Sequence, residues 1–137
     1  MNQELGKPYK ILIVDDDKFL LNMYSIKFKK EQFDVTTASN GLEALEHLRG
    51  GLMPDAIILD IVMPVMDGLE SLQNIRKESL AKTSIIIILS NNGQSSDIEK
   101  AKELGINGYI VKATTIPAEV VSEVLRVLKI SNKPAQK

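Results

Sequence analysis

The sequence predicts an α/β fold in which helices cover both faces of a parallel sheet, and two observations lead to this prediction. Short runs of β-branched residues alternate with longer segments of helical periodicity, five times along the chain. Two of the runs, AIIL at residues 56–59 and IIIIL at residues 85–89, are apolar at every position, which is typical of strands covered on both sides. Five strand–helix units in strict alternation indicate a doubly wound parallel sheet.

The strands are expected at the β-branched runs, and the helices between them. Two helix starts carry a capping box, Asn40 with Glu43 and Ser96 with Glu99, in which side chains bond free amide groups of the first turn. The expected strands are Lys10–Val14, Asp34–Ala38, Ala56–Leu59, Ile85–Leu89 and Tyr109–Val111. The expected helices run from Asp16 or Asp17 to about Lys30, from Asn40 to Gly50, from Gly68 to about Lys77, from Ser96 to Gly105 and from Pro117 to about Leu128.

Apolar residues at helical spacing indicate which face of each helix is buried. The expected inward-facing residues are Phe19, Met23 and Ile26 in the first helix, Leu42, Leu45 and Leu48 in the second, Leu69, Leu72 and Ile75 in the third, and Val120, Val121, Val124, Leu125 and Leu128 in the last. The ends of the chain are polar, so residues 1–8 and 131–137 are expected to be flexible segments around one domain at residues 9–130.

The size and composition of the chain limit the functions it can have. With 137 residues, one domain is expected. Seventeen basic and eighteen acidic residues leave a net charge of −1, which gives no reason to expect nucleic acid or a membrane as a partner. Cysteine is absent, which excludes disulfides and thiol chemistry. The chain has no signal-peptide pattern and no apolar run long enough to cross a bilayer, so a cytoplasmic protein is expected.

Polar and charged side chains follow four of the five predicted strands. They are Asp15 and Asp16 after the first strand, Asp60 after the third, Ser90 after the fourth and Lys112 after the fifth. Ligand sites in open parallel sheets form at the carboxyl ends of the strands, near the point where strand order reverses. The second strand offers no charge there, as expected of an outer strand in the order 2-1-3-4-5.

Three carboxylates on one edge, with no histidine or cysteine among them, suit Mg²⁺, which prefers oxygen ligands. Asp15 and Asp16 alone would equally suit a solvated turn, but the positions of Asp60 and Lys112 favour a site. A carboxylate beside a metal ion and a lysine is also a candidate nucleophile that forms an acyl phosphate.

Four stretches of the chain resemble the motifs of bacterial response-regulator receiver domains: ILIVDDD at residues 11–17, LDIVMPVMDG at 59–68, IIILS at 86–90 and GYIVKA at 108–113. The resemblance covers about residues 9–130. It implies a flavodoxin-like fold and a phosphoacceptor domain of a two-component signalling system, similar to single-domain chemotaxis regulators.

The resemblance implies a role for each residue of the edge. Asp60 would accept the phosphoryl group, Asp16 would bind Mg²⁺ directly, and Asp15 would act mostly through water. The other implied roles are a backbone carbonyl ligand to the metal from Val62, contacts to the phosphoryl group from Ser90 and Lys112, an aromatic switch at Tyr109, and control of the phosphoryl lifetime by Val62 and Asn92.

The implied partners are a sensor histidine kinase or a histidine phosphotransfer protein, and an effector protein that binds the surface of the fourth helix, fifth strand and fifth helix. The chain would be a monomer or a weak, phosphorylation-dependent dimer. It would have no enzymatic activity beyond its own phosphorylation and dephosphorylation.

Two positions depart from the family pattern, and two other functions compete with this interpretation. Ala113 stands where the family usually has proline, and Asn91 stands where it usually has a smaller residue. A Mg²⁺-dependent phosphohydrolase would need a second acid two positions after Asp60, where the chain has Val62. A flavin carrier would need a phosphate-binding loop after the first strand, where the three acids of residues 15–17 would repel phosphate.

Overall fold

The computed structural model describes residues 8–91 and 95–135, and its five strands form one parallel sheet in the order β2-β1-β3-β4-β5. This confirms the predicted fold class and strand order. The strands are β1 (Lys10–Val14), β2 (Asp34–Ala38), β3 (Ala56–Leu59), β4 (Ile85–Ser90) and β5 (Gly108–Val111). The helices are α1 (Lys18–Lys30), α2 (Gly41–Arg49), α3 (Gly68–Lys77), α4 (Ser95–Leu104) and α5 (Pro117–Ala135), with a short 3-10 helix at Lys112–Thr114.

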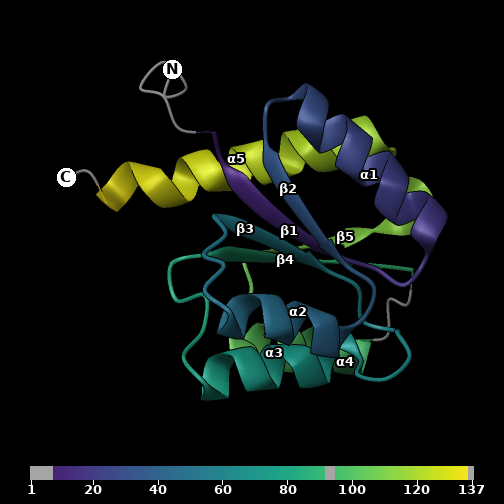
Figure 1. Ribbon diagram of the computed structural model, residues 1–137, viewed down its shortest axis with the longest axis vertical. Coiled ribbons are helices and arrows are strands. Elements are labelled where there is room, and N and C mark those ends of the chain that lie inside the picture. The colour runs from purple at the N-terminus through teal and green to yellow at the C-terminus, as the bar shows by residue number, and fades with distance from the viewer. Residues whose placement is uncertain (1–7, 92–94, 136–137) are drawn as a thin grey trace.

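Helices cover the sheet on both sides, α1 and α5 on one face and α2, α3 and α4 on the other (Figure 1). Alternate residues of the central strands therefore enter two separate cores. Ile13, Ile58 and Ile87 pack on the side of α1 and α5, whereas Leu12 and Ile57 pack on the opposite side. Because both faces are buried, these strands need apolar residues at every position, which explains the uninterrupted runs in the sequence.

The register of the strands brings their carboxyl ends to the same level. Val14 at the end of β1 pairs with Leu59 at the end of β3, and Leu59 pairs in turn with Ile88 of β4. Ser90 pairs with Val111 at the end of β5. The residues that directly follow these strand ends are therefore neighbours at one edge of the sheet.

The structure corrects the predicted inward face of α1. Asp17 is the N-cap, and its side chain accepts hydrogen bonds from the amides of Phe19 and Leu20. Phe19 and Ile26, which were expected to face the core, are 72% and 53% exposed. The buried face instead carries Tyr24 and Phe28, which lie one turn apart and give the helix a second apolar stripe.

The remaining corrections concern α2 and α5. Leu42 of α2 is 38% exposed, and Ala44 takes its place in the core beside Leu45 and Leu48. The last helix continues to Ala135, past the end expected at about Leu128. Among the described residues, none of the helices combines the length and the apolar character that a membrane span requires.

Candidate functional site

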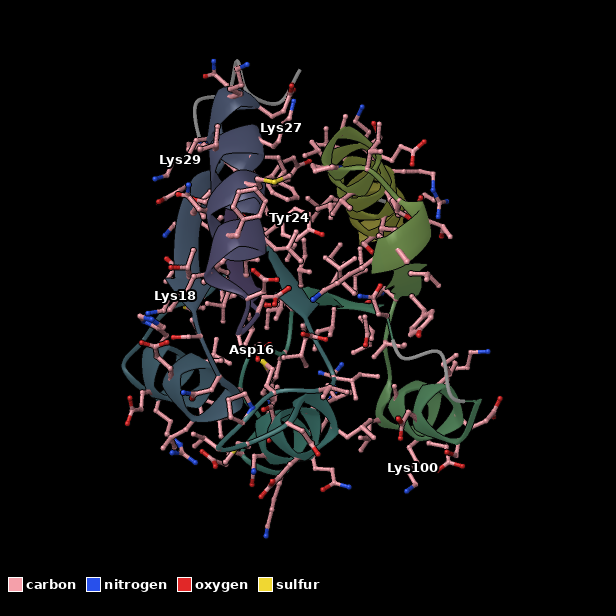
Figure 2. The ribbon with its side chains drawn as sticks, turned by 90° about the vertical axis from the view of Figure 1, so that its right-hand side faces the viewer. Asp16, Lys18, Tyr24, Lys27, Lys29 and Lys100 are labelled. Carbon is pink, nitrogen blue, oxygen red and sulfur yellow. The ribbon has the colours of Figure 1, made fainter. Side chains whose placement is uncertain are left out.

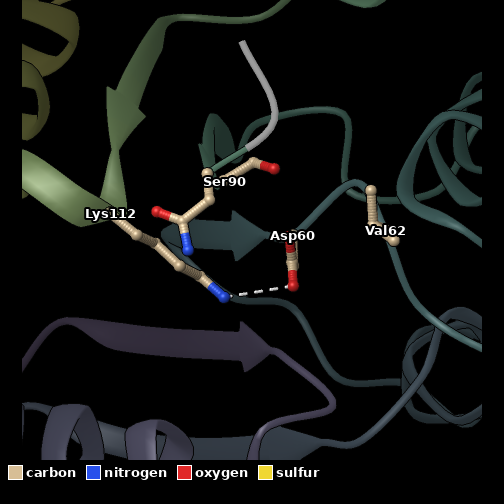
Figure 3. A pocket seen from close by; sticks show the side chains of 5 residues that line it. Asp60, Val62, Ser90 and Lys112 are labelled. Atoms are coloured by element: carbon tan, nitrogen blue, oxygen red, sulfur yellow. Dashed lines mark hydrogen bonds and ion pairs between the residues drawn. The ribbon is translucent and has the colours of Figure 1, made fainter.

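A cleft of about 410 Å³ opens at the carboxyl edge of the sheet. It is lined by Asp60, Val62, Ser90, Asn91 and Lys112. Figure 3 shows the side chain of Lys112 extended toward Asp60, with Val62 on the other side of that carboxylate. Ser90 is the last residue of β4, and its side chain is buried.

The carboxylates of Asp15, Asp16 and Asp60 meet beside this cleft. Each offers an oxygen atom, and these oxygens lie within 4.8 Å of one another. Asp15 and Asp60 are buried, whereas Asp16 is exposed. The pairing of β1 with β3 brings them together, since the amide of Asp60 donates a hydrogen bond to the carbonyl oxygen of Val14 at 3.0 Å.

Lys112 reaches both buried carboxylates. Its Nζ atom lies 2.8 Å from Oδ2 of Asp15 and 3.2 Å from Oδ2 of Asp60. The side chain of Lys112 is only 9% exposed, so water screens these contacts weakly. No peptide bond within residues 8–91 and 95–135 is cis, so Lys112 makes both contacts with a trans bond to Ala113.

Burial and charge shift the protonation of this group in a defined direction. Burial raises the pKa of Asp60, the carboxylates of Asp15 and Asp16 raise it further, and Lys112 opposes the increase. Burial by itself would lower the pKa of Lys112, but its hydrogen bonds and charge interactions with Asp15 and Asp60 outweigh burial and raise it. Lys112 is therefore a permanent cation at neutral pH, placed between two acids.

The oxygens of this edge fit a divalent cation. The amide of Asp17 donates a hydrogen bond of 2.9 Å to Oδ1 of Asp15. The second oxygen, Oδ2, is buried and has no well-aligned hydrogen-bond donor, although its ion-pair contact to Lys112 is short. An oxygen-only donor set with unused acceptor capacity matches the preference of Mg²⁺, which retains several waters.

The structure also adds a residue that the sequence prediction missed. Tyr24 is 2% exposed and lies between α1 and α5 (Figure 2), close enough to the site for its charges to act on the phenol. Burial raises the pKa of Tyr24, Lys112 opposes this, and Asp15 and Asp60 add to it. Its position four residues before Phe28, on one helical stripe, was the available signal.

The other candidate residues lie at the periphery of the cleft or outside the described part. Tyr109 lies on β5, half-buried, and packs against the core on the side of α2, α3 and α4. Val62 is 57% exposed beside Asp60. Asn92, expected to influence the phosphoryl lifetime, lies outside the described residues.

The model of the response regulator receiver domain family matches residues 11–124. The chain is 39% identical to the probable transcriptional regulator ycf27 of Guillardia theta, over 96% of this chain and 50% of that protein. It is 34% identical to the chemotaxis protein CheY of Halobacterium salinarum, over 85% of this chain and 96% of that protein. The chain spans about half the length of several curated relatives, among them a CpxR homolog of Haemophilus influenzae.

Solved structures show the same fold. The CheY-like receiver domain protein of Methanospirillum hungatei superposes with a TM-score of 0.86 at 23% identity, over 93% of this chain and 99% of that one. The chemotaxis response regulator CheY4 of Vibrio cholerae has a TM-score of 0.79 at 30% identity, over 88% and 99% of the two chains. These similarities disfavour the phosphohydrolase and flavin-carrier alternatives.

Proposed function

The chain belongs to the response regulator receiver domain family of two-component systems, and from that premise we propose that Asp60 is its phosphoacceptor. The donor would be a sensor histidine kinase or a histidine phosphotransfer protein. The family match over residues 11–124 supports a receiver domain with the proposed boundaries 9–130. We propose a signalling module and not an enzyme.

The observation that carries the proposal is the position of Asp60. Its carboxylate lies at the wall of an open cleft, between a group of acids and the ammonium group of Lys112. In the transfer, an oxygen of Asp60 forms a bond to phosphorus as the bond between phosphorus and the donor's imidazole nitrogen breaks. The electron pair of the broken bond stays on that nitrogen, and the imidazole leaves as a neutral ring because its other nitrogen carries a proton. Lys112 and Ser90 lie where they can contact the oxygens of the transferred group.

The residues that would hold Mg²⁺ are Asp15, Asp16 and Asp60, together with the backbone carbonyl of Val62. When bound, the cation offsets the negative charge of the carboxylates and of the phosphoryl group. The convergence of oxygens from these three carboxylates, two of them buried, supports this assignment. Lys112, which contacts Asp15 and Asp60, supplies further positive charge.

Phosphorylation would change the protein through Ser90 and Lys112. The new group adds negative charge and three acceptor oxygens, which attract the serine hydroxyl and the ammonium group. A shift at Ser90 would reach Tyr109 on the neighbouring strand β5, which pairs with β4. We propose that this shift alters the surface of α4, β5 and α5, where an effector protein would bind.

The lifetime of the phosphorylated form is proposed to depend on Val62. Hydrolysis requires a water in line with the phosphorus atom, opposite the Asp60 oxygen. Val62 borders the cleft with an apolar, branched side chain that offers no hydrogen bond to such a water. Val62→Asn is expected to speed dephosphorylation about fivefold, the effect of one hydrogen bond of about 1 kcal/mol. Unchanged or slower decay would contradict this role.

The direct test is labelling of purified variants with acetyl phosphate and Mg²⁺, followed by intact mass. Wild type is expected to gain one phosphoryl group, and Asp60→Asn none. Asp67→Asn is the matched control, because Asp67 caps α3 in the loop that follows Asp60, and asparagine caps a helix equally well. Labelling of Asp60→Asn to the wild-type level would place the acceptor elsewhere.

A further inference from the structure

Helix α4 is held to the body of the molecule less firmly than α5. Among the α4 side chains that the structure describes, residues 96–104, only Ala101 is buried, while Ile98 and Leu104 are half-buried. In contrast, α5 buries Val120 and Val124 completely, with further buried residues along the same face. Apolar burial therefore fixes α5, whereas α4 depends on other contacts.

The C-terminal end of α4 is fixed by a side chain from the neighbouring helix. Arg76, near the end of α3, donates from Nε to the carbonyl oxygen of Leu104 at 2.9 Å, and from its terminal nitrogen to the carbonyl oxygen of Gly105. These carbonyls are among the acceptors that a helix leaves unpaired at its C-terminus, where positive charge is also favoured. Gly105 has a φ of +92°, which lets the chain turn away directly after the helix.

The segment after α4 is tied to the sheet at the same end. The amide of Asn107 donates to the carbonyl oxygen of Ile86 at 2.7 Å, and the side-chain oxygen of Asn107 accepts from the amide of Ile86 at 2.8 Å. The turn that follows α4 is thus bonded to Arg76 of α3 at its start and, through Asn107, to β4 at its end. This end of α4 lies far from the site, because strands and helices of the sheet run in opposite directions.

The N-terminal end of α4 has few such contacts in the part that the structure describes. Ser96, Glu99 and Lys100 are exposed, and Lys100 points away from the body of the molecule (Figure 2). This end follows Ser90 in the chain and lies near β5. Burial raises the pKa of Tyr109 on β5, and the charge of Asp97 in the first turn of α4 raises it further, which shows that the two residues are close. The end of the helix that Arg76 anchors is therefore the one far from the site, and the other end lies next to the site.

We propose that Arg76 is a positioning residue that anchors the C-terminal end of α4, so that the helix answers a change at Ser90 by pivoting about that end. The inference rests on the proposed function, because it assumes that the change at Ser90 follows from a group on Asp60. The Arg76 guanidinium bonds two backbone carbonyls whatever the state of Asp60. The movement is then confined to residues 95–100, and the turn at Gly105 stays in place.

The test uses backbone amide NMR on three variants of the full chain. Arg76→Gln removes the charge and the forked donor, and Arg76→Lys keeps a cation that can reach one carbonyl. Arg49→Gln is the matched control, because Arg49 of α2 also contacts α3 at this end of the molecule, through Glu78, but does not touch α4. Each variant is measured with Mg²⁺ alone and with Mg²⁺ and beryllofluoride, which occupies a phosphoryl site.

The first readout is hydrogen exchange without beryllofluoride, which tests the anchor alone. Arg76→Gln is expected to speed exchange in the last turn of α4, residues 102–105, by about tenfold, since hydrogen bonds to a charged donor are strong. Arg76→Lys should recover part of the protection, and Arg49→Gln should match wild type. Equal exchange in Arg76→Gln and wild type would overturn the proposal.

The second readout is the distribution of shifts that beryllofluoride causes. In wild type and Arg49→Gln, the changes within α4 should concentrate in residues 95–100, and in Arg76→Gln they should extend through residues 101–105. Equal changes in both halves of wild-type α4 would overturn the pivot. A wild type that shows no shifts and no labelling on Asp60 would overturn the proposed function instead. If Arg76→Gln fails to fold, Arg76→Lys carries both readouts, with the same directions and smaller size.

Discussion

The two ends of the sheet are built in opposite ways. At the carboxyl end, the carboxylates of Asp15 and Asp60 are buried and share a single cation, Lys112. At the amino end, hydrogen bonds to backbone groups close the loops: the hydroxyl of Ser84 donates to the carbonyl oxygen of Pro54, Asn107 bonds both the amide and the carbonyl of Ile86, and the carboxylate of Asp55 accepts from the amide of Lys10. The carboxyl end therefore carries unbalanced negative charge, whereas the polar groups named at the amino end are paired.

This difference separates the residues that stabilise the fold from those that serve its function. Like charges that are buried side by side oppose folding, and a protein retains them where they bind or react. Paired backbone groups in loops have no such cost. We therefore expect substitutions at the carboxyl end to change stability strongly and in both directions, and substitutions at the amino end to change it little.

The largest effect is expected from Lys112→Met. This substitution leaves Asp15 and Asp60 buried without their cation, and removing one partner of a buried ion pair costs about 3 kcal/mol. Urea unfolding at pH 7 without Mg²⁺ measures the loss, and added Mg²⁺ should restore part of it. Lys100→Met is the control, since Lys100 is exposed on α4. Equal stability of Lys112→Met and wild type would contradict the proposed difference between the carboxyl and amino ends of the sheet.

The second effect concerns Mg²⁺ itself. At ten times its dissociation constant, a cation that binds only the folded protein adds about 1.4 kcal/mol to the free energy of unfolding. Asp16→Asn should be slightly more stable than wild type without Mg²⁺, because it relieves repulsion, and should lose most of the gain that Mg²⁺ gives. Asp17→Asn, which removes a neighbouring charge but keeps the helix cap, should respond to Mg²⁺ as wild type does.

A smaller effect, of opposite sign to that of Lys112→Met, is expected from Asp60→Asn. Because burial raises the pKa of Asp60 above its ordinary value of 3.8, ionisation of Asp60 disfavours the folded state. The contribution of Asp60 to stability is therefore highest below pH 3.8 and is lost as the pH rises through the folded pKa. The stability of Asp60→Asn relative to wild type, measured without Mg²⁺, should grow across that interval and then stay constant. If the stability advantage of Asp60→Asn over wild type shrinks as the pH rises, ionisation of Asp60 does not disfavour the folded state and the prediction is wrong.

The smallest effect is expected at the amino end, from Arg49→Gln. Arg49 and Glu78 form a two-pronged ion pair between α2 and the end of α3, but both side chains reach solvent, at 46% and 33% exposure. Water and salt screen such pairs. We expect no measurable change in urea unfolding at 0.15 M salt. A loss as large as that of Lys112→Met would mean that both ends of the sheet stabilise the fold equally.

Most of the fold could be predicted from the sequence, because its signals are local. β-branched runs, helical periodicity and capping residues predicted the five strands and the five α-helices of the described residues, and Asp17 and Asn40 cap their helices as expected. The cap expected at Ser96 was wrong, because α4 already begins at Ser95. The buried face of α1 was predicted wrongly because the helix carries two apolar stripes. Packing against the sheet and against α5 decides between them, and these contacts join residues that are far apart in the sequence.

The sequence was enough to predict which residues form the site, but not which of them contact one another. Parallel strands in register imply that residues after the strand ends meet, so Asp15, Asp60 and Lys112 could be grouped from the sequence. The closer approach of Lys112 to Asp15 than to Asp60 is a matter of three-dimensional geometry that strand order alone does not set. Arg76 carried no signal in the sequence, since its partners are backbone carbonyls that any residue could supply.

The position of β1 between β2 and β3 bears on the order in which the chain assembles. Because β1 pairs with both β2 and β3, residues 10–59 form a contiguous unit of three strands and two helices, whose close spacing in sequence favours early formation. The carboxylates of Asp15, Asp16 and Asp60 meet in or directly after that unit, whereas Lys112 follows the last strand to be synthesised. If residues 10–59 fold during synthesis, the acids come together before Lys112 is made, and we expect a dissolved divalent cation to offset their charge until the chain is complete.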